Sequence, residues 1–545
     1  MLPALRGAFS RQVLQSRQLH LLGSAVVQQW RYSSTRPLSS WCTSERAPDF
    51  LDDVVQRRQV QTVAGMTDRG ELPPMPAWGA AGVTTLMHQA VKLDNAEMAA
   101  ATLKQLRQDY LALPPPERRE SLLVLAKEFG VDRGSVSSSC AHYLKVQADV
   151  GSHSTAESQA TLLHAERELR KALNPLAGRL FEALHNQTGG LRFLSDMRAD
   201  LLQSIRATND PFLRNLDSVL KEKLSTWLGP AYLELRRLTW DSPASVLAKV
   251  AEHEQVHPIR SVQDLQQRLG AGCRLFGYFH PSMPGEPLIF VEVALLDKLA
   301  ATMQEVAAPQ ADEEKARAAI FYSIDATQPG LSGIDLGNLL LKGVVQILRA
   351  ELPNLEIFST LSPVPGFLPW LRPKLALHAS LTGDVDSSFA EELLYQDEAQ
   401  AILRAVLPAK LVEDSSDRTL HAEACGCLAS LLFADGPDWV RNPVHADALQ
   451  GPLMRLCARY IYKEKKRGKA LDGVTNFHVR NGATVERLNW LADDSPLRME
   501  SSAGIMVNYQ YRFDTIEKNN KAYLMEGTIA ASEQFLAFVH RKSSL

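Results

Sequence analysis

The chain has 545 residues, of which 45% are hydrophobic and 22% are charged, and its formal net charge is −3. This length predicts roughly two large domains or three to four smaller ones. The near-neutral balance excludes a global electrostatic field that would attract nucleic acid or an anionic membrane. No apolar run reaches about 18 residues, so no transmembrane helix is expected.

The six cysteines are scattered through the chain, which is typical of reduced intracellular thiols rather than of a disulfide framework. They are Cys42, Cys140, Cys273, Cys425, Cys427 and Cys457. Cys425 and Cys427 lie near His421 and could be imagined as half of a metal site. A second half-site at zinc spacing is missing, and the neighbouring segment LASLLF indicates a buried helix, so no metal is expected.

Both ends of the chain resemble targeting signals. Residues 1–44 contain five arginines and many serines, and no acidic residue precedes Glu45, as in a mitochondrial or plastid presequence. A disordered basic tail is the alternative. The last three residues, 543–545, read Ser-Ser-Leu and differ from the peroxisomal address Ser-Lys-Leu at the middle position. These signals predict a mitochondrial matrix location, a peroxisomal location, or both.

A polar stretch dotted with proline and glycine, residues 45–80, is predicted to be a linker. Residues 81–255 then carry helical periodicity without strand alternation and predict one helical-bundle domain. Within it, Asp210 and Pro211 form an N-cap followed by proline at the first helical position, a strong signal for a helix start.

The character of the sequence changes near residue 257, and 256–545 is predicted to form a mixed α/β domain. Strand-like segments cover 274–280, 286–295, 318–324, 357–367 and 504–513, and helical ones cover 338–352, roughly 385–470 and 531–542. The strand at 318–324, the helix at 338–352 and the next strand predict a β-α-β unit.

The segment HEQVH at 253–257 matches the H-E-x-x-H pattern of zinc proteases. That chemistry needs both imidazoles on one face of a continuing helix. Pro258 follows His257 directly and pushes it out of the helical region, so the match is interpreted as a coincidence.

A glycine-rich bend, TQPGLSGIDLGN at 327–338, joins the first strand of the β-α-β unit to its helix. Backbone N–H groups in such a bend, together with a helix N-terminus, can cradle a phosphate. The bend has neither the G-K-[ST] ending of a P-loop nor a clean G-x-G-x-x-G, and a tight turn without a ligand is the alternative. The second strand ends at Ser362, and parallel strands bind ligands at their carboxyl ends, so the bend and Ser362 should open on one crevice.

Two further features lie near the C-terminal end. His478 precedes the turn residues Asn481-Gly482, and a lone histidine in such a place is usually structural. The run YKEKKRGKA at 462–470 could meet a phosphate, although a solvated helix end is the plainer interpretation.

Over about 450 residues, long segments of the chain resemble malonyl-CoA decarboxylase in the same order. They are LELRRLTWDSPASVLAKVAEHEQVHPIRS (233–261), MPGEPLIFVEVAL (283–295), IFYSIDATQPGLSGIDLGN (320–338), FSTLSPVPGFLPWL (358–371), GPLMRLCARYIYKEKKRGKALDGVTNFHVRNGA (451–483) and GIMVNYQYR (504–512).

The resemblance implies an α+β protein, with an N-terminal all-α helical bundle used in oligomerisation and a C-terminal catalytic domain of the acetyltransferase (GNAT) fold. It implies conversion of malonyl-CoA and a proton to acetyl-CoA and CO2 without metal or organic cofactor, a homotetramer, and a mitochondrial, peroxisomal or cytosolic location. The family's malonyl-CoA-binding loop matches Ser332, Gly333, Ile334, Asp335, Leu336, Gly337 and Asn338. Its catalytic serine and histidine match Ser362 and His478.

This sequence departs from the family pattern at two positions. The acid of the loop is Asp335 where the family has glutamate, so its carboxylate reaches one methylene less far. Thr360 stands where the family usually has serine, a milder change.

Decarboxylation requires residues of these types. Loss of CO2 leaves an enolate, which needs hydrogen-bond donors for its oxygen and a proton donor for C2. We expect His478 to be that donor, with a pKa near the working pH, Ser362 to bind the malonyl group, and Asp335 to orient one of the two. The bend is expected to hold the pyrophosphate of coenzyme A. The alternatives are a CoA-dependent acyltransferase of the same fold and a non-catalytic CoA-binding scaffold.

Overall fold

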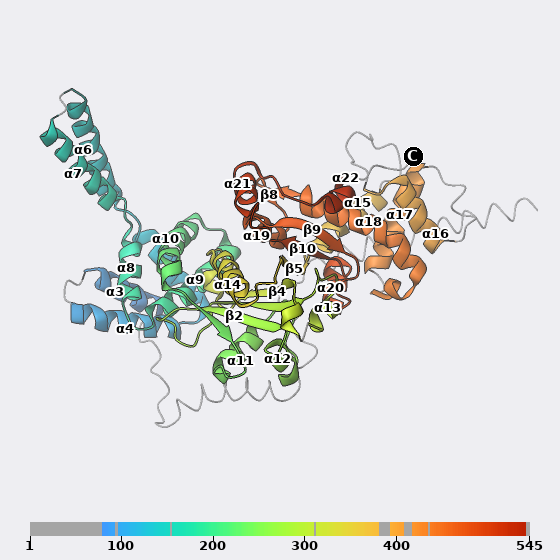
Figure 1. The fold of residues 1–545 in the computed structure, drawn as a ribbon. Helices are drawn as coiled ribbons and strands as arrows, with labels where there is room; N and C mark the ends of the chain where they lie inside the picture. The colour runs from blue at the N-terminus through green and yellow to red at the C-terminus, as the bar shows by residue number, and fades with distance from the viewer. Residues whose placement is uncertain are drawn as a thin grey trace, which may run out of the picture.

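The computed structural model describes residues 79–92, 96–152, 155–309, 312–380, 393–407, 417–433 and 437–540. The predicted presequence, nearly all of the predicted linker and the C-terminal tripeptide lie outside these ranges. In the described part, a helical region is followed by a mixed α/β region, as predicted (Figure 1). None of the described helices is both long enough and apolar enough to cross a bilayer.

The helical region contains eight helices among the described residues. They are α3 (Gly79–Lys92), α4 (Ala96–Ala112), α5 (Pro115–Glu128), α6 (Arg133–Ser152), α7 (Ala156–Ala172), α8 (Leu176–His185), α9 (Gly190–Thr208) and α10 (Pro211–Trp227). The predicted start of α10 is confirmed, because the Asp210 carboxylate accepts hydrogen bonds from the N–H groups of Phe212 and Leu213. Leucines along one face of α10 are buried, as its amphipathic pattern predicts.

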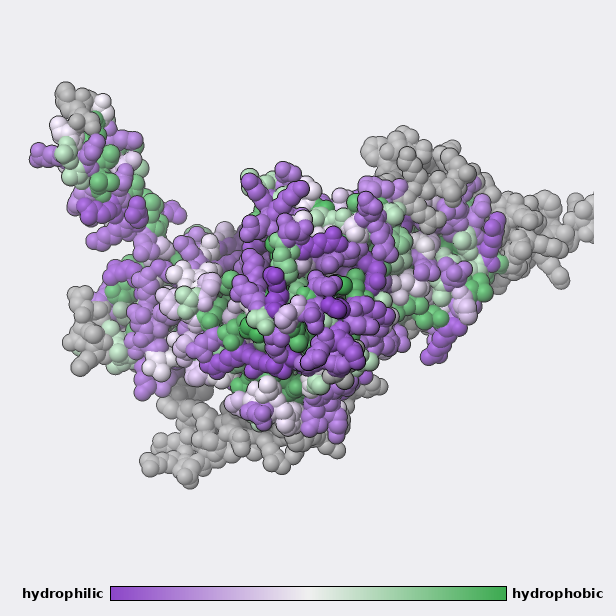
Figure 2. Space-filling model, viewed as in Figure 1, coloured by the Kyte–Doolittle hydropathy of each residue, from purple (hydrophilic) through white to green (hydrophobic). Residues whose placement is uncertain are grey.

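The helices do not form one uniform bundle. Helices α6 and α7 pair as a hairpin that projects away from the rest of the molecule (Figure 1). Its surface mixes hydrophobic and hydrophilic residues, and Leu144 and Leu163 are exposed on it (Figure 2). The other six helices share a core built from residues such as Leu106, Phe181 and Leu194.

The mixed region is organised around one twisted sheet. Its strands are β1 (Glu234–Leu238), β2 (Cys273–Phe279), β3 (Ile289–Leu296), β4 (Ala318–Ala326), β5 (Ile357–Thr360), β6 (Ser362–Pro363), β9 (Thr484–Asn489) and β10 (Met506–Gln510). The order is β1-β2-β3-β4-β5-β10-β6, with β9 paired to β10. Among the strands that the structure describes, β4 and β5 form the one parallel pair, and helix α14 (Leu336–Glu351) connects them, which confirms the predicted β-α-β unit.

Strand β1 corrects the expectation that residues 81–255 are free of strands. Residues 234–238 pair antiparallel with β2 along their whole length, so the sheet begins ahead of the expected boundary at 255/256. β1 is an edge strand whose charged residues are mostly exposed, so it shows no alternation. Its extended form is set by pairing with β2 rather than by local propensity.

Helices cover both faces of the sheet. On one face α14 packs through Leu340 and Val344 against side chains such as Val291 and Phe321. On the other face lie α11 (Ala244–His253), α12 (Val262–Arg268) and α13 (Met303–Ala307) (Figure 1). Residues on the two faces alternate along β3 and β4, as expected for strands buried on both sides.

The rest of the chain is mainly helical and follows β6. It contains α15 (Phe367–Ala379), α16 (Gln396–Val406), α17 (Asp417–Phe433), α18 (Pro443–Tyr462), the short strands β7 (Lys465–Lys466) and β8 (Lys469–Ala470), α19 (Gly473–Arg480), α20 (Pro496–Ser502), α21 (Ile516–Glu526) and α22 (Glu533–His540). The predicted helical insertion is therefore confirmed. Cys425 is buried inside α17, as its apolar neighbours predicted.

Candidate active site

The glycine-rich bend leaves β4 through a short 3-10 turn, Pro329–Leu331, and enters α14 at Leu336. Gly333 has φ +76°, a left-handed conformation that favours glycine. Asp335 sits at the N-cap position of α14, but its side chain makes no capping hydrogen bond among the described contacts. The first N–H groups of α14 have no intrahelical acceptor, so this end of the helix can receive an anion.

Ser362 and His478 meet in a buried place, although 116 positions separate them in sequence. Ser362 Oγ lies 3.3 Å from His478 Nε2 and donates to Thr360 Oγ1 at 2.9 Å. Ser362 is 6% exposed and His478 is 4% exposed. Strand β6 presents the serine and helix α19 presents the histidine, so the fold brings together the two residues that the sequence singled out.

The bend adjoins this pair through Phe477. A Cβ atom added to Gly337 would lie 2.7 Å from Cζ of Phe477, the residue before His478. The first turn of α14 therefore packs directly on α19, and a larger residue at position 337 would have to displace the aromatic ring.

The surroundings of His478 are aromatic and uncharged. Its ring stacks on Tyr509 with centroids 4.5 Å apart, and its Nδ1 lies 2.8 Å from the Tyr511 hydroxyl. Burial lowers the pKa of His478 from its usual 6.5 to about 3. The expectation of a pKa near the working pH is therefore wrong for the free site, because no anion stands beside the ring to offset its desolvation.

The hydrogen-bond partners of His478 are compatible with a proton on Nε2. Burial raises the pKa of Tyr511 well above its usual range, so its hydroxyl keeps its proton and can donate to Nδ1. A neutral imidazole that accepts at Nδ1 carries its proton on Nε2. That proton then points toward Ser362, whose own hydroxyl is directed to Thr360.

Asp335 does not reach this pair. Its carboxylate lies 3.6 Å from the guanidinium of Arg480, at the end of α19, and both side chains are about half exposed. The described contacts include none between Asp335 and either Ser362 or His478, so the expectation that Asp335 orients one of them is not met in this structure. The short aspartate side chain instead bridges the bend to α19.

The basic run lies on the hairpin of β7 and β8, next to α19 and α21. Lys465 and Lys466 are exposed, and the Lys465 ammonium lies 5.9 Å from the ring centroid of Tyr523. Partial burial lowers the pKa of Lys465. The hairpin that carries these cations borders the helix of His478, and Lys465 Nζ also lies 3.5 Å from the carbonyl oxygen of Gly527.

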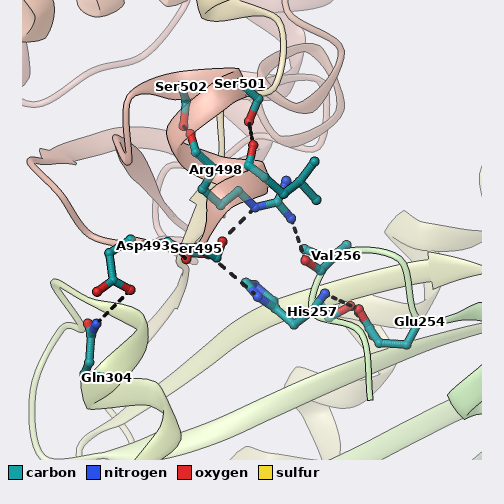
Figure 3. Close-up of polar contacts among 12 residues, drawn as sticks. Glu254, Val256, His257, Gln304, Asp493, Ser495, Arg498, Ser501 and Ser502 are labelled. Carbon is teal, nitrogen blue, oxygen red and sulfur yellow. Dashed lines mark hydrogen bonds and ion pairs between the residues drawn. The ribbon is translucent and has the colours of Figure 1, made fainter. Parts of the chain in front are cut away.

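The HEQVH segment forms no zinc-protease site. Helix α11 ends at His253, so the two imidazoles are not on one helix. His257 instead faces Asp493, with Nδ1 4.0 Å from the carboxylate, and the backbone N–H of His257 donates to the Glu254 carboxylate (Figure 3). In the part of the chain that the structure describes, no group of three or more His, Cys, Asp or Glu side chains is placed to hold a metal ion.

His257 belongs to a charged network on the face of the sheet opposite α14. Arg498 lies 3.8 Å from Asp493 and donates to the Val256 carbonyl (Figure 3). Nearby, Arg268 pairs at 2.8 Å with Glu292, which is 1% exposed. This network ties the loop after α11 and helix α12 to the sheet and to α20.

Sequence reasoning missed Thr360 as a hydrogen-bond partner and missed Tyr509, Tyr511 and Arg480 entirely. The segment NYQYR at 508–512 did carry a signal, because alternation along a strand places Tyr509 and Tyr511 on one face. Tyr511 contacts His478, which lies 33 positions away on helix α19, so this partner could not be deduced from local pattern.

Comparisons with known proteins show the family of this chain. A family model described as the malonyl-CoA decarboxylase C-terminal domain matches residues 231–544, and one described as its N-terminal domain matches residues 129–228. The chain is 39% identical over 438 residues to the mitochondrial malonyl-CoA decarboxylase of Anser anser anser, covering 79% of this chain and 81% of that protein. It is 40% identical over 430 residues to the mitochondrial enzyme of Mus musculus, covering 78% and 82%.

Solved structures give the same result. The crystal structure of malonyl-CoA decarboxylase from Rhodopseudomonas palustris matches with a TM-score of 0.64 and 31% identity, covering 84% of this chain and 99% of that one. The crystal structure of the Agrobacterium vitis protein of the same name matches with a TM-score of 0.67 and 29% identity, covering 84% and 100%.

Proposed function

Since this chain belongs to the malonyl-CoA decarboxylase family, it is an enzyme that decarboxylates malonyl-CoA, and we propose that Ser362 and His478 carry out the reaction. The observation that carries this proposal is the buried contact of 3.3 Å between Ser362 Oγ and His478 Nε2. The pair lies beside a bend that can bind an anion, and it presents one hydroxyl and one ring N–H to a ligand.

The bend over 332–338 supplies the binding site for coenzyme A in this proposal. The N–H of Gly333, which makes no hydrogen bond among the described contacts, and the N-terminus of α14 attract the pyrophosphate. The malonyl thioester then extends toward Phe477 and His478, because the first turn of α14 packs on that helix. Ser332 and Asn338 add side-chain donors.

His478 donates the proton that C2 gains. When the C–CO2 bond breaks, its electron pair stays on the thioester as an enolate, CO2 leaves, and one proton is taken up at C2. A neutral imidazole is a poor donor, but a malonyl carboxylate beside the ring raises its pKa and lets it take up a proton from solvent. Ser362 hydrogen-bonds the malonyl group and keeps it in line with Nε2.

Arg480 and Asp335 bridge the bend and α19 at the mouth of this site. The pair is half exposed, so its electrostatic contribution to stability is small. In this proposal the pair fixes the position of the coenzyme-binding bend relative to the helix that carries His478. Asp335 therefore acts through Arg480 and does not orient His478 directly.

The basic hairpin is assigned to the 3′-phosphate of coenzyme A. Replacing Lys465 and Lys466 by alanine is expected to raise KM for malonyl-CoA far more than it lowers kcat, because the phosphate lies away from the reacting carbons. Lys145→Ala with Lys171→Ala, on the projecting hairpin, is the matched control. An unchanged KM in the double variant at 465 and 466 would remove these lysines from the site.

We also propose the remaining features of the family for this chain. The order β4, glycine bend, α14 and parallel β5 supports an acetyltransferase-like catalytic domain, and the end of α10 at Trp227 supports a domain junction near residue 230.

A homotetramer assembled through the helical domain is supported by the exposed leucines of the projecting hairpin. Mitochondrial relatives support a mitochondrial location, and the partial match of residues 543–545 to Ser-Lys-Leu is the basis for proposing a peroxisomal one as well.

The test uses the purified full chain with malonyl-CoA as the only substrate and follows acetyl-CoA formation. We expect turnover by the wild type, and a loss of roughly 10²-fold or more in kcat for Ser362→Ala. Turnover that survives in Ser362→Ala would remove the serine from the reaction. Transfer of an acyl group to an added amine, without decarboxylation, would favour the acyltransferase alternative. Binding without any turnover would favour the scaffold.

A further inference from the structure

The coenzyme-binding bend is held in place by the helical domain. Arg198 on α9 is buried, with its side chain 2% exposed, and its Nε forms an ion pair with Asp217 on α10 at 2.8 Å. Its Nη1 donates to the carbonyl oxygens of Gly330 at 2.5 Å and Ser332 at 2.9 Å. A single guanidinium therefore links two helices of one region to the bend of the other.

The contact between α9 and the bend is close as well as polar. A Cβ atom on Gly330 would lie 1.8 Å from the carbonyl oxygen of Ser195, so only glycine allows this approach. Lys221 of α10 also approaches the bend, because a Cβ atom added to Gly333 would lie 3.2 Å from the Lys221 ammonium. The bend thus rests on α9 and α10 rather than standing free in solvent.

The bond to Ser332 sets the direction of one peptide group. In a trans peptide the C=O and the following N–H point in opposite directions, so the N–H of Gly333 points away from Arg198. This N–H makes no hydrogen bond among the described contacts. Gly333 has a glycine's backbone freedom, and without Arg198 the peptide between Ser332 and Gly333 could rotate and present its carbonyl oxygen instead.

We propose that Arg198 is a positioning residue for the substrate: it locks the bend so that the N–H of Gly333 faces the phosphates of malonyl-CoA. The catalytic domain would then depend on the helical domain for substrate affinity as well as for assembly. This inference rests on the proposed binding of coenzyme A by the bend. A buried cation paired with an acid and with two carbonyl groups has its hydrogen bonds fixed in direction, which suits this task.

The experiment compares Arg198→Gln with Arg118→Gln. Arg118 is a matched control because it also donates to two carbonyl oxygens, those of Leu111 and Leu113, and pairs with Asp200 on α9, but it does not touch the bend. For Arg198→Gln we expect KM for malonyl-CoA and the dissociation constant of CoA to rise on the order of tenfold or more, with kcat lowered much less. Arg198→Lys should recover part of the affinity, because its ammonium can reach one carbonyl.

Hydrogen–deuterium exchange of 329–338 in the free protein separates this inference from the proposed activity. Faster exchange there in Arg198→Gln, but not in Arg118→Gln, together with weaker CoA binding, supports the inference even if the wild type shows no decarboxylation. Equal CoA affinity and equal exchange in the two variants would overturn it. If Arg198→Gln does not fold, Asp217→Asn replaces it, and unchanged KM and exchange in that variant would overturn the inference in the same way.

Discussion

Each face of the sheet carries a buried histidine, and the two histidines differ in the charges that surround them. His478, on the α14 face, is surrounded by Tyr509, Tyr511 and Ser362, and burial alone lowers its pKa. On the other face His257 is also buried and also has a lowered pKa, through burial and then through Arg498, but Asp493 opposes the shift. A charge-free pocket leaves the proton affinity of His478 to be set by whatever binds, whereas the proton affinity of His257 is already influenced by the charges of Arg498 and Asp493.

This difference predicts the largest effect on activity. His478→Gln keeps a planar polar side chain of similar size but cannot donate a proton to C2, so kcat should fall by roughly 10²- to 10⁴-fold. His257→Gln is the control on the opposite face and should leave kcat within about twofold. Steady-state kinetics with malonyl-CoA measures both. Comparable losses of kcat in the two variants would mean that His478 has no more direct part in the reaction than His257.

The charged face should instead dominate stability. Arg268→Met removes the partner of Glu292 and leaves a carboxylate that is 1% exposed without its counter-charge. Breaking such a buried pair costs about 3 kcal/mol or more of unfolding free energy. Arg317→Met, which breaks an exposed pair with Glu356, should cost about 1 kcal/mol or less. Urea unfolding measures both, and the kcat of folded Arg268→Met should remain at the wild-type level.

A stability loss in Arg268→Met no larger than that in Arg317→Met would contradict this comparison. It would mean that Glu292, whose pKa burial raises, simply takes up a proton when the arginine is lost. The pH dependence of unfolding in the variant would then reveal the neutral carboxyl group.

The pocket of His478 also predicts how stability depends on pH. Its pKa is about 3 in the folded protein and near 6.5 in the unfolded chain, so the unfolded chain binds more protons. Stability is therefore full above pH 6.5 and declines as the pH falls toward 3. Between pH 6.5 and 5 the unfolding free energy of the wild type should fall by on the order of 2 kcal/mol more than that of His478→Gln. His142→Gln, at an exposed position on α6, should follow the wild type.

Much of this fold was readable from local pattern, and much of the site was not. The β4–α14–β5 unit was predicted because apolar periodicity and glycine placement act within a few residues. β1 was missed because its strand state depends on pairing with β2, about 40 positions away. Ser362 and His478 were found through resemblance, but the low pKa of His478 and the pairing of Asp335 with Arg480 depend on side chains brought together only by folding.

The smallest predicted effect concerns the contact that joins the bend to the proton donor. In Gly337→Ala the new methyl group would lie 2.7 Å from the Phe477 ring, so the ring must move and His478 next to it must shift. We expect kcat/KM to fall about tenfold, since a small displacement of a donor is costly in rate. Gly426→Ala, within α17, is the control, because its methyl group would meet nothing closer than the Cβ atom of Ala379 at 4.0 Å.

Alanine is the better helix former, so Gly426→Ala should hold or raise stability without changing activity. A melting temperature of Gly337→Ala close to that of the wild type, together with a loss of activity, would separate a catalytic defect from a folding one. If kcat/KM of Gly337→Ala equals that of Gly426→Ala, the Phe477 ring can turn aside without moving His478. The bend and the proton donor would then be coupled through the ion pair of Asp335 and Arg480 alone, and the double variant Asp335→Asn, Arg480→Gln would carry the loss instead.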